Sequence, residues 1–167
     1  SITLRSLEKL VDEVIHCHRY ESRRFCISKQ DYDVVVVGAG NAALCAALAA
    51  RESDASVLIL ERAPESQKGG NSRYTAGAMR VVYQDANDLT SLMPELSDDE
   101  INGADFGNYT REQFYDDMGR ITQYRSDPDL TELLIENSLS TLQWMNSRGV
   151  RFLPMYGNQA FKVDGEF

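Results

Sequence analysis

The stretch that decides the fold is DYDVVVVGAGNAALCAALAAR, residues 31–51. Four consecutive valines, Val34 to Val37, end at Gly38, which is typical of a strand buried on both faces of a parallel sheet. Residues 42–51 are rich in alanine and leucine and contain no helix breaker, so they predict a helix packed closely on that sheet. A second strand is expected over residues 56–61. This order predicts a right-handed βαβ unit, the building block of doubly wound α/β sheets.

A dinucleotide-binding fingerprint, G-x-G-x-x-A, lies where the first strand meets the helix. Gly38 permits a tight turn, Gly40 lets the backbone approach a pyrophosphate, and the small Ala43 lets the helix sit close to the strand. The helix N-terminus offers N–H groups and partial positive charge to the phosphates. Taken alone, the string is equally well explained by an ordinary glycine turn. The candidate contacts are Gly38, Ala39, Gly40, Asn41, Ala42 and Ala43.

An acidic residue at the end of the second strand strengthens the case for a dinucleotide. Glu61 follows Gly40 by 21 residues, at the place where a carboxylate accepts hydrogen bonds from the adenosine ribose hydroxyls. A carboxylate there disfavours a 2′-phosphate, so NADP is the least favoured dinucleotide. The alternative is a solvated strand end. The candidate site includes Glu61 and its neighbour Arg62.

A loop of small residues, GGNSRYTAGAM, follows the second strand at positions 69–79. Small side chains and backbone donors suit a segment that passes close to a diphosphate and a flat ring. The loop therefore favours FAD over NAD. Its candidate cofactor contacts are Gly69, Gly70, Asn71, Ser72, Ala76, Gly77 and Ala78.

The same loop resembles the flavoprotein family of fumarate reductase, succinate dehydrogenase and L-aspartate oxidase, whose members carry a G-G-N-[ST]-x-x-A-x-G-G-like string after the ribose-binding glutamate. This sequence departs from the string at Thr75 and Ala78, which are both small. The resemblance implies a Rossmann-like FAD-binding domain, incomplete in this chain. Members that bind flavin covalently carry a histidine where this sequence has Asn71. The resemblance therefore implies noncovalent FAD.

Further segments extend the resemblance. Residues 144–152 are similar to the family's W-[LM]-x-x-x-G-V-x-F turn. The strings at 96–101 and 105–110, together with residues 38–50, look most like the tricarballylate dehydrogenase branch. This implies dehydrogenation of a carbon-carbon single bond in a small-molecule carboxylate, with an electron acceptor that the sequence does not identify. Alternatives are the same flavin fold acting on a 3-ketosteroid or corrin precursor, and a short noncatalytic product that binds nucleotide or a partner.

The expected organisation is an N-terminal extension at 1–30, the first part of the FAD-binding domain at 31–153, and the start of a capping domain at 154–167. The extension reads as an amphipathic helix because apolar residues recur at three- and four-residue steps from Leu4 to Ile15. In the family, substrate-binding and proton-carrying residues lie in later segments. No catalytic residue is assigned here. Half a doubly wound sheet leaves an edge strand and an apolar face exposed, so the isolated chain should be poorly stable or associate.

The rest of the chain is less regular. Loops and short helices are expected over residues 84–108, where Asp98, Asp99 and Glu100 suit a helix start. A largely helical stretch should run from Asp127 to Gly149 with Trp144 in the core, followed by a short strand over residues 150–153.

Composition excludes several classes of function. The net charge of −9 argues against nucleic acid, and no apolar run is long enough to cross a bilayer. Three irregularly spaced cysteines suit reduced thiols in the cytoplasm, with Cys45 as a small buried thiol. No metal site is expected from His16, Cys17, His18 and Cys26. Arg80 and Tyr83 fit surface or packing roles better than contact with a carboxylate substrate.

Overall fold

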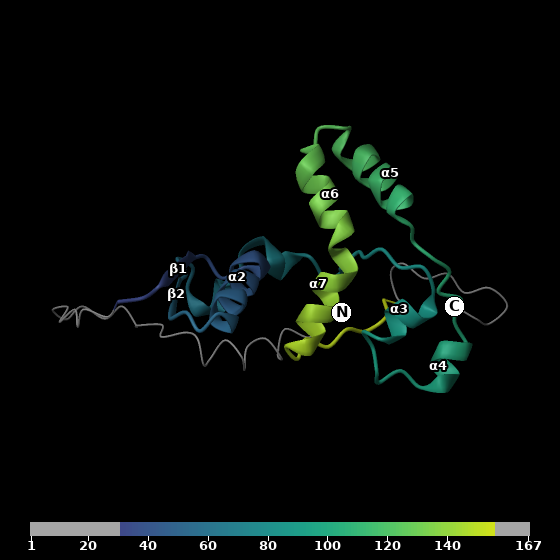
Figure 1. Ribbon diagram of the computed structural model, residues 1–167, viewed down its shortest axis with the longest axis horizontal. Helices are drawn as coiled ribbons and strands as arrows, with labels where there is room; N and C mark the ends of the chain where they lie inside the picture. Colours follow the sequence, from purple (N-terminus) through teal and green to yellow (C-terminus); the bar gives the residue numbers. More distant parts are fainter. Residues whose placement is uncertain (1–30, 156–167) are drawn as a thin grey trace. The chain divides into compact units, whose positions relative to one another are not determined.

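A computed structural model describes residues 31–155. The described residues form two units, 31–77 and 78–155 (Figure 1). The predicted helix of the N-terminal extension and nearly all of the predicted capping segment lie outside the described residues. The domain boundaries proposed from the sequence therefore stay predictions.

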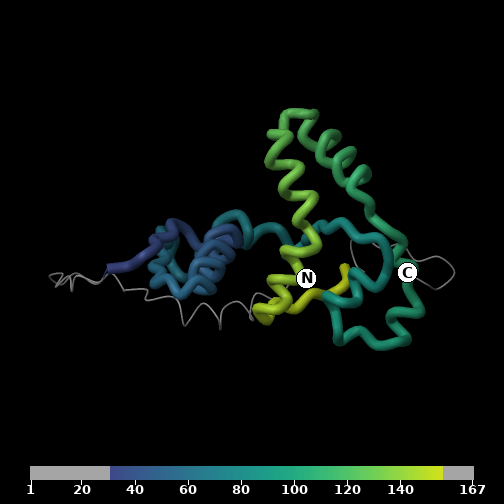
Figure 2. The backbone as a smooth tube through the Cα atoms, in the orientation of Figure 1, coloured from purple at the N-terminus to yellow at the C-terminus, as the bar shows by residue number. Residues whose placement is uncertain are grey.

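The first unit is a βαβ arrangement. Strand β1 (Val34–Val37) and strand β2 (Val57–Leu60) are parallel, and helix α2 (Asn41–Glu52) connects them. Val34 is in register with Val57. The helix packs on both strands (Figure 2). Ala47 of the helix is buried in one core with Val57 and Ile59 of β2. The predicted order of strand, helix and strand is confirmed.

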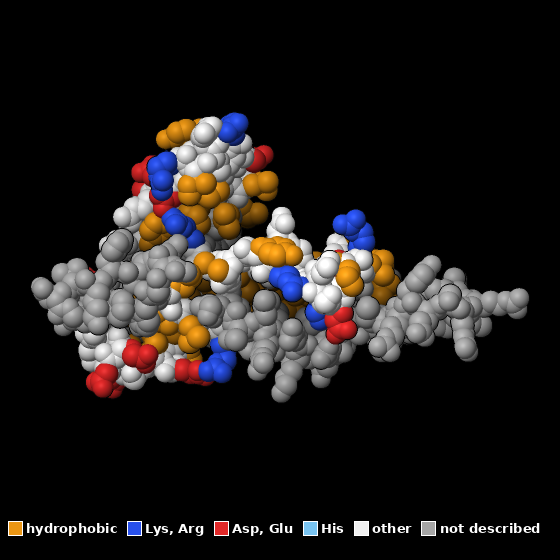
Figure 3. Space-filling model, turned by 180° about the vertical axis from the view of Figure 1, so that it is seen from behind, with side chains coloured by type: hydrophobic (Ala, Val, Ile, Leu, Met, Phe, Trp, Pro, Cys, Tyr) orange, Lys and Arg blue, Asp and Glu red, His pale blue; other side chains and the backbone are white. Residues whose placement is uncertain are grey.

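The prediction that the first strand is buried on both faces is wrong. Along β1 the side chains alternate, and Val35 and Val37 are 52% and 82% exposed. In β2, Leu60 is 48% exposed. The cause is that α2 covers one face of the two strands and nothing in residues 31–77 covers the other. Half a doubly wound sheet was expected to leave such an apolar face exposed, and hydrophobic side chains are visible on the surface of the described residues (Figure 3).

The second unit is helical. The short helices α3 (Ala86–Thr90) and α4 (Asp98–Asn102) confirm the expectation for residues 84–108. Helix α5 (Arg111–Thr122) lies beside α6 (Pro128–Glu136), and α7 (Ser138–Ser147) follows α6. The acidic start of α4 is also confirmed, because Ser97 and Glu100 form a reciprocal capping box there.

The predicted helical stretch from Asp127 to Gly149 is two helices. It begins as expected, because the Asp127 side chain accepts a hydrogen bond from the Leu130 N–H and Pro128 occupies the first turn. At Asn137, which separates α6 from α7, the side-chain amide donates to the Leu133 carbonyl at 2.8 Å. Such a local side-chain bond competes with the regular helix pattern.

The predicted strand over residues 150–153 is absent from the described part of the chain. The Val150 N–H donates to the Met145 carbonyl, and the Val150 carbonyl accepts from the Asn146 amide at 3.2 Å. The end of α7 thus occupies both backbone groups that a strand would need. Val150 is fully buried at this helix end.

The core of the second unit differs in part from the one expected. Ile135, Leu142 and Met145 are buried, whereas Trp144 is half-buried. Three leucines of α6 that continue the apolar pattern are exposed: Leu130, Leu133 and Leu134. Within residues 31–155, no helix is long and apolar enough to cross a membrane.

Candidate functional site

The glycine turn between β1 and α2 brings three segments together. Gly38 has φ of +110°, a conformation that glycine adopts without steric cost, and its N–H donates to the Leu60 carbonyl at 2.7 Å. A Cβ placed on Gly40 would lie 3.4 Å from both the Gly69 carbonyl oxygen and the Ser72 Oγ. The loop at 69–72 therefore packs directly against the fingerprint turn.

The N-terminus of α2 is available to an anion. Gly40 is its N-cap, no side chain makes a cap hydrogen bond there, and the first turn contains no acidic residue. The Asn41 N–H donates to the Ser72 Oγ at 3.0 Å, while Ala42 and Ala43 supply first-turn N–H groups that have no partner within a helix. Such a terminus favours a phosphate through its N–H groups and its dipole.

Glu61 connects the end of β2 to the glycine turn. One carboxylate oxygen accepts from the Ala39 N–H at 2.8 Å, and the other accepts from the Ala63 N–H at 2.7 Å. These bonds lower the pKa of Glu61, and the bond from Ala63 has the largest effect. Desolvation of the carboxylate opposes them. The ionised carboxylate fixes the fingerprint turn and retains lone pairs for ribose hydroxyls. Sequence reasoning missed the bond to Ala39, because spacing alone does not show which backbone group a strand-end carboxylate meets.

The predicted flavin loop is irregular and mostly exposed. It contains a 3₁₀ turn (Gly70–Tyr74), and Gly69, Ala76 and Gly77 have positive φ. Ala76 is the unusual member, because a left-handed conformation costs about 1 kcal/mol or more for a residue with a Cβ.

The structure thus brings together the fingerprint turn, Glu61, Gly69 and Ser72. Asn71 and Arg62 are exposed and make no hydrogen bond to the turn within the described residues. Ala78 belongs to the second unit. The grouped residues fit the dinucleotide part of FAD: a helix N-terminus for the pyrophosphate, glycines at the close approach, and a carboxylate at the end of the second strand.

Residues 33–166 match the FAD binding domain family. The chain belongs to this family. FAD is therefore its cofactor, as the sequence predicted, and the matched segment contains the turn, Glu61 and the flavin loop.

Several relatives of the chain are named as reductases. It is 30% identical over 129 residues to the vinyl phenol reductase of Lactiplantibacillus plantarum, covering 75% of this chain and 22% of that protein. Over 119 residues it is 30% identical to the fumarate reductase (cytochrome) of Shewanella frigidimarina, covering 70% and 18%. The urocanate reductase of Eggerthella lenta is 30% identical over 122 residues, covering 71% and 17%.

The chain spans about a fifth of the length of these curated relatives. No solved structure matches it. The family and its cofactor are thus shown.

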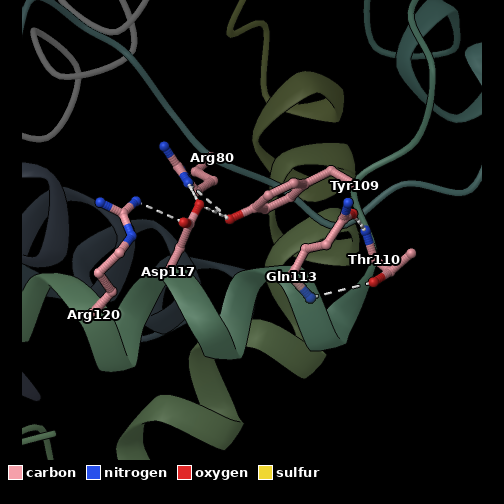
Figure 4. Close-up of polar contacts among 6 residues, drawn as sticks. All are labelled: Arg80, Tyr109, Thr110, Gln113, Asp117 and Arg120. Atoms are coloured by element: carbon pink, nitrogen blue, oxygen red, sulfur yellow. Dashed lines mark hydrogen bonds and ion pairs between the residues drawn. The ribbon is translucent and has the colours of Figure 1, made fainter.

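The two residues considered for substrate contact, Arg80 and Tyr83, both have partners in the second unit. The Tyr83 hydroxyl donates to the Phe106 carbonyl at 2.8 Å, and its backbone pairs with Tyr109. Arg80 donates to the Tyr109 hydroxyl at 2.8 Å and forms an ion pair with Asp117 (Figure 4). Tyr83 thus has the packing role that was favoured, while Arg80 is part of a polar cluster.

Asp117 lies at the centre of that cluster, and the pKa of its carboxyl group can be tested by titration. Hydrogen bonds from Arg120 and Tyr109 and the charges of Arg80 and Arg120 lower its pKa from 3.8 to about 2. Because the folded pKa is lower than the unfolded one, the ionised form stabilises the fold above about pH 4, and this stabilisation is lost as pH falls toward 2. An NMR titration of the Asp117 carboxyl carbon should give this low midpoint. A midpoint near 4 would show that the cluster does not persist in solution.

Metal binding has no support in the described residues, where no group of three or more His, Cys, Asp or Glu side chains is placed to hold an ion. His16, Cys17, His18 and Cys26 lie outside those residues. Cys45 on α2 is half-buried, and this burial raises the pKa of its thiol. The thiol is therefore protonated and unreactive near neutral pH.

Proposed function

We propose that this protein is an FAD-dependent dehydrogenase of the fumarate reductase class that oxidises a carbon-carbon single bond next to a carboxylate, as in tricarballylate. The observation that carries the proposal is the match of residues 33–166 to the FAD binding domain family, together with the flavin loop packed on the fingerprint turn. The fold around the site is proposed to be Rossmann-like. The FAD is proposed to be noncovalent, because Asn71 cannot form the covalent link that a histidine forms.

The residues of the first unit are proposed to hold the dinucleotide. The first-turn N–H groups of α2 would bind the pyrophosphate, and Gly40 would let it approach the backbone. Glu61 would accept hydrogen bonds from the adenosine ribose while holding the turn through Ala39. The loop from Gly69 to Ala78 would lie along the flavin. When bound, FAD accepts the hydride that leaves the substrate carbon.

The substrate class is supported by two kinds of resemblance. Fumarate and urocanate, which appear in the names of two relatives, each contain a carbon-carbon double bond next to a carboxylate. The choice of a tricarboxylate rests on the strings at residues 96–101 and 105–110 together with residues 38–50. We also propose a cytoplasmic location, because the cysteines are spaced as reduced thiols rather than as a disulfide framework. Catalytic residues are not assigned to this chain.

A half-reaction tests the proposed chemistry. The protein, expressed from its full gene and loaded with FAD, is mixed with tricarballylate without oxygen, and the visible flavin absorption is followed. We expect the absorption to bleach and cis-aconitate to form in equal amount, because the substrate gives its hydride to the flavin. Reduced flavin that is reoxidised by a 3-keto-alkene steroid but not by cis-aconitate or fumarate would instead assign the alternative substrate class.

A further inference from the structure

The polar cluster in the second unit carries an excess of positive charge. Two guanidinium groups, of Arg80 and Arg120, meet the single carboxylate of Asp117. Arg80 comes from the segment after the flavin loop and Arg120 from α5, and Figure 4 shows them reaching the same carboxylate. In a chain with a net charge of −9, this is a local site with one uncompensated positive charge.

Both arginines have donor capacity to spare. The bonds of Arg80 to Tyr109 and Asp117 use its Nη1 alone, and the bond of Arg120 to Asp117 uses its Nη2 alone. Each guanidinium has five N–H donors in a fork that matches two oxygens of an anion. The side chains are 43% and 72% exposed, so solutes can reach them. Among residues 31–155, no other acceptor is shown for their remaining nitrogens.

Arg80 is also held in place before any ligand arrives. Its guanidinium lies over the Tyr109 ring at 5.2 Å from the centroid, and it donates to that residue's hydroxyl. The hydroxyl in turn donates to Asp117 at 2.8 Å, and the ring packs on Phe114. A side chain already fixed by its neighbours loses little conformational entropy on binding. This favours the cluster as a binding site over a pair of freely moving surface arginines.

We propose that Arg80 and Arg120 together bind a carboxylate group of a small molecule, with Asp117 and Tyr109 as positioning residues. A carboxylate suits the site because its two oxygens match the fork of a guanidinium and its single negative charge balances the single excess positive charge. Arg80 follows Ala78, the last residue of the proposed cofactor loop, by two positions, which limits their Cα atoms to about 7 Å apart. Assigning this carboxylate to the substrate rests on the proposed function, and the site would add to the substrate-binding residues that the family carries in later segments.

The test is calorimetric titration of the full chain with tricarballylate, with Arg120→Gln as the variant. Arg120 is largely exposed and contributes little packing, so its replacement should leave the fold intact. Removing one charged donor group should weaken binding about tenfold. Arg125→Gln is the matched control, because it removes the same charge from an exposed arginine close in sequence and should change the dissociation constant less than twofold.

Each outcome decides the inference. A selective loss in Arg120→Gln supports the site, and equal losses in both variants would overturn it, because they would reflect net charge only. Failure of the unmodified chain to bind tricarballylate would also overturn it. Flavin content is read separately from the absorption spectrum. A colourless chain that still shows Arg120-dependent binding would support the carboxylate site and count against the proposed function. A yellow chain that does not bind tricarballylate would overturn the carboxylate site and leave FAD binding in place.

Discussion

Replacing Glu61 with alanine should weaken FAD binding by at least about tenfold and lower the thermal unfolding midpoint. The carboxylate accepts hydrogen bonds from the Ala39 and Ala63 N–H groups, so its removal frees the fingerprint turn as well as the proposed ribose contact. The dissociation constant for FAD, measured by fluorescence quenching of the flavin, reports the first effect. Calorimetry of the chain without added FAD reports the second.

Two further variants separate the contributions of Glu61. Glu65→Ala removes the same charge from an exposed residue of the next turn and should change neither quantity. The FAD affinity and unfolding midpoint of Glu61→Gln should lie between those of the unmodified chain and of Glu61→Ala. The glutamine amide keeps one acceptor oxygen but places N–H donors opposite the other backbone N–H. If Glu61→Ala bound FAD as tightly as the unmodified chain, the proposed role of this residue in the cofactor site would be wrong.

Replacing Gly40 with valine should have the largest effect, a loss of FAD affinity of about a hundredfold or more. A bare Cβ at this position already lies 3.4 Å from the Gly69 carbonyl and the Ser72 Oγ, so the two valine methyls must push the loop away. They would also fill the approach that the pyrophosphate requires. Equilibrium dialysis with FAD measures the loss.

The control for Gly40→Val is Ala49→Val, which adds the same methyl branching at an exposed position of α2. It should keep FAD affinity within about twofold, since its only cost is a few tenths of a kcal/mol of helix propensity. Comparable losses in the two variants would mean that the effect comes from the helix and not from the turn.

Local sequence signals predicted the parts of this fold that local interactions determine. The βαβ order follows from the valine run, the glycine turn and the alanine-rich segment. The start of α6 at Asp127-Pro128 was likewise predictable, because an N-cap side chain acts within one helical turn. Helix α5 was missed although its signal is present: Thr110 and Gln113 form a reciprocal capping box.

Features that depend on distant partners were not predictable in this way. Whether Val35 and Val37 are buried depends on what covers the second sheet face, and the valine pattern does not report that. The strand expected over residues 150–153 failed because the end of α7 takes the backbone groups of Val150. In the site, the fingerprint, its spacing to Glu61 and the small-residue loop placed Gly40, Glu61 and Ser72 in one candidate set, but their contacts were visible only once the chain was folded.

The most direct test of the account is the visible absorption spectrum of the protein purified from cells, followed by acid precipitation. We predict the two bands of oxidised flavin, their complete transfer to the supernatant on precipitation, and release of FAD rather than FMN, since the site is proposed to bind the adenosine ribose and pyrophosphate as well as the ring. Flavin that stays with the precipitated protein would contradict the prediction of noncovalent FAD, which rests on Asn71 in place of a histidine. A chain that takes up no flavin, even when refolded with excess FAD, would contradict the claim that these residues form the nucleotide-binding part of an FAD site.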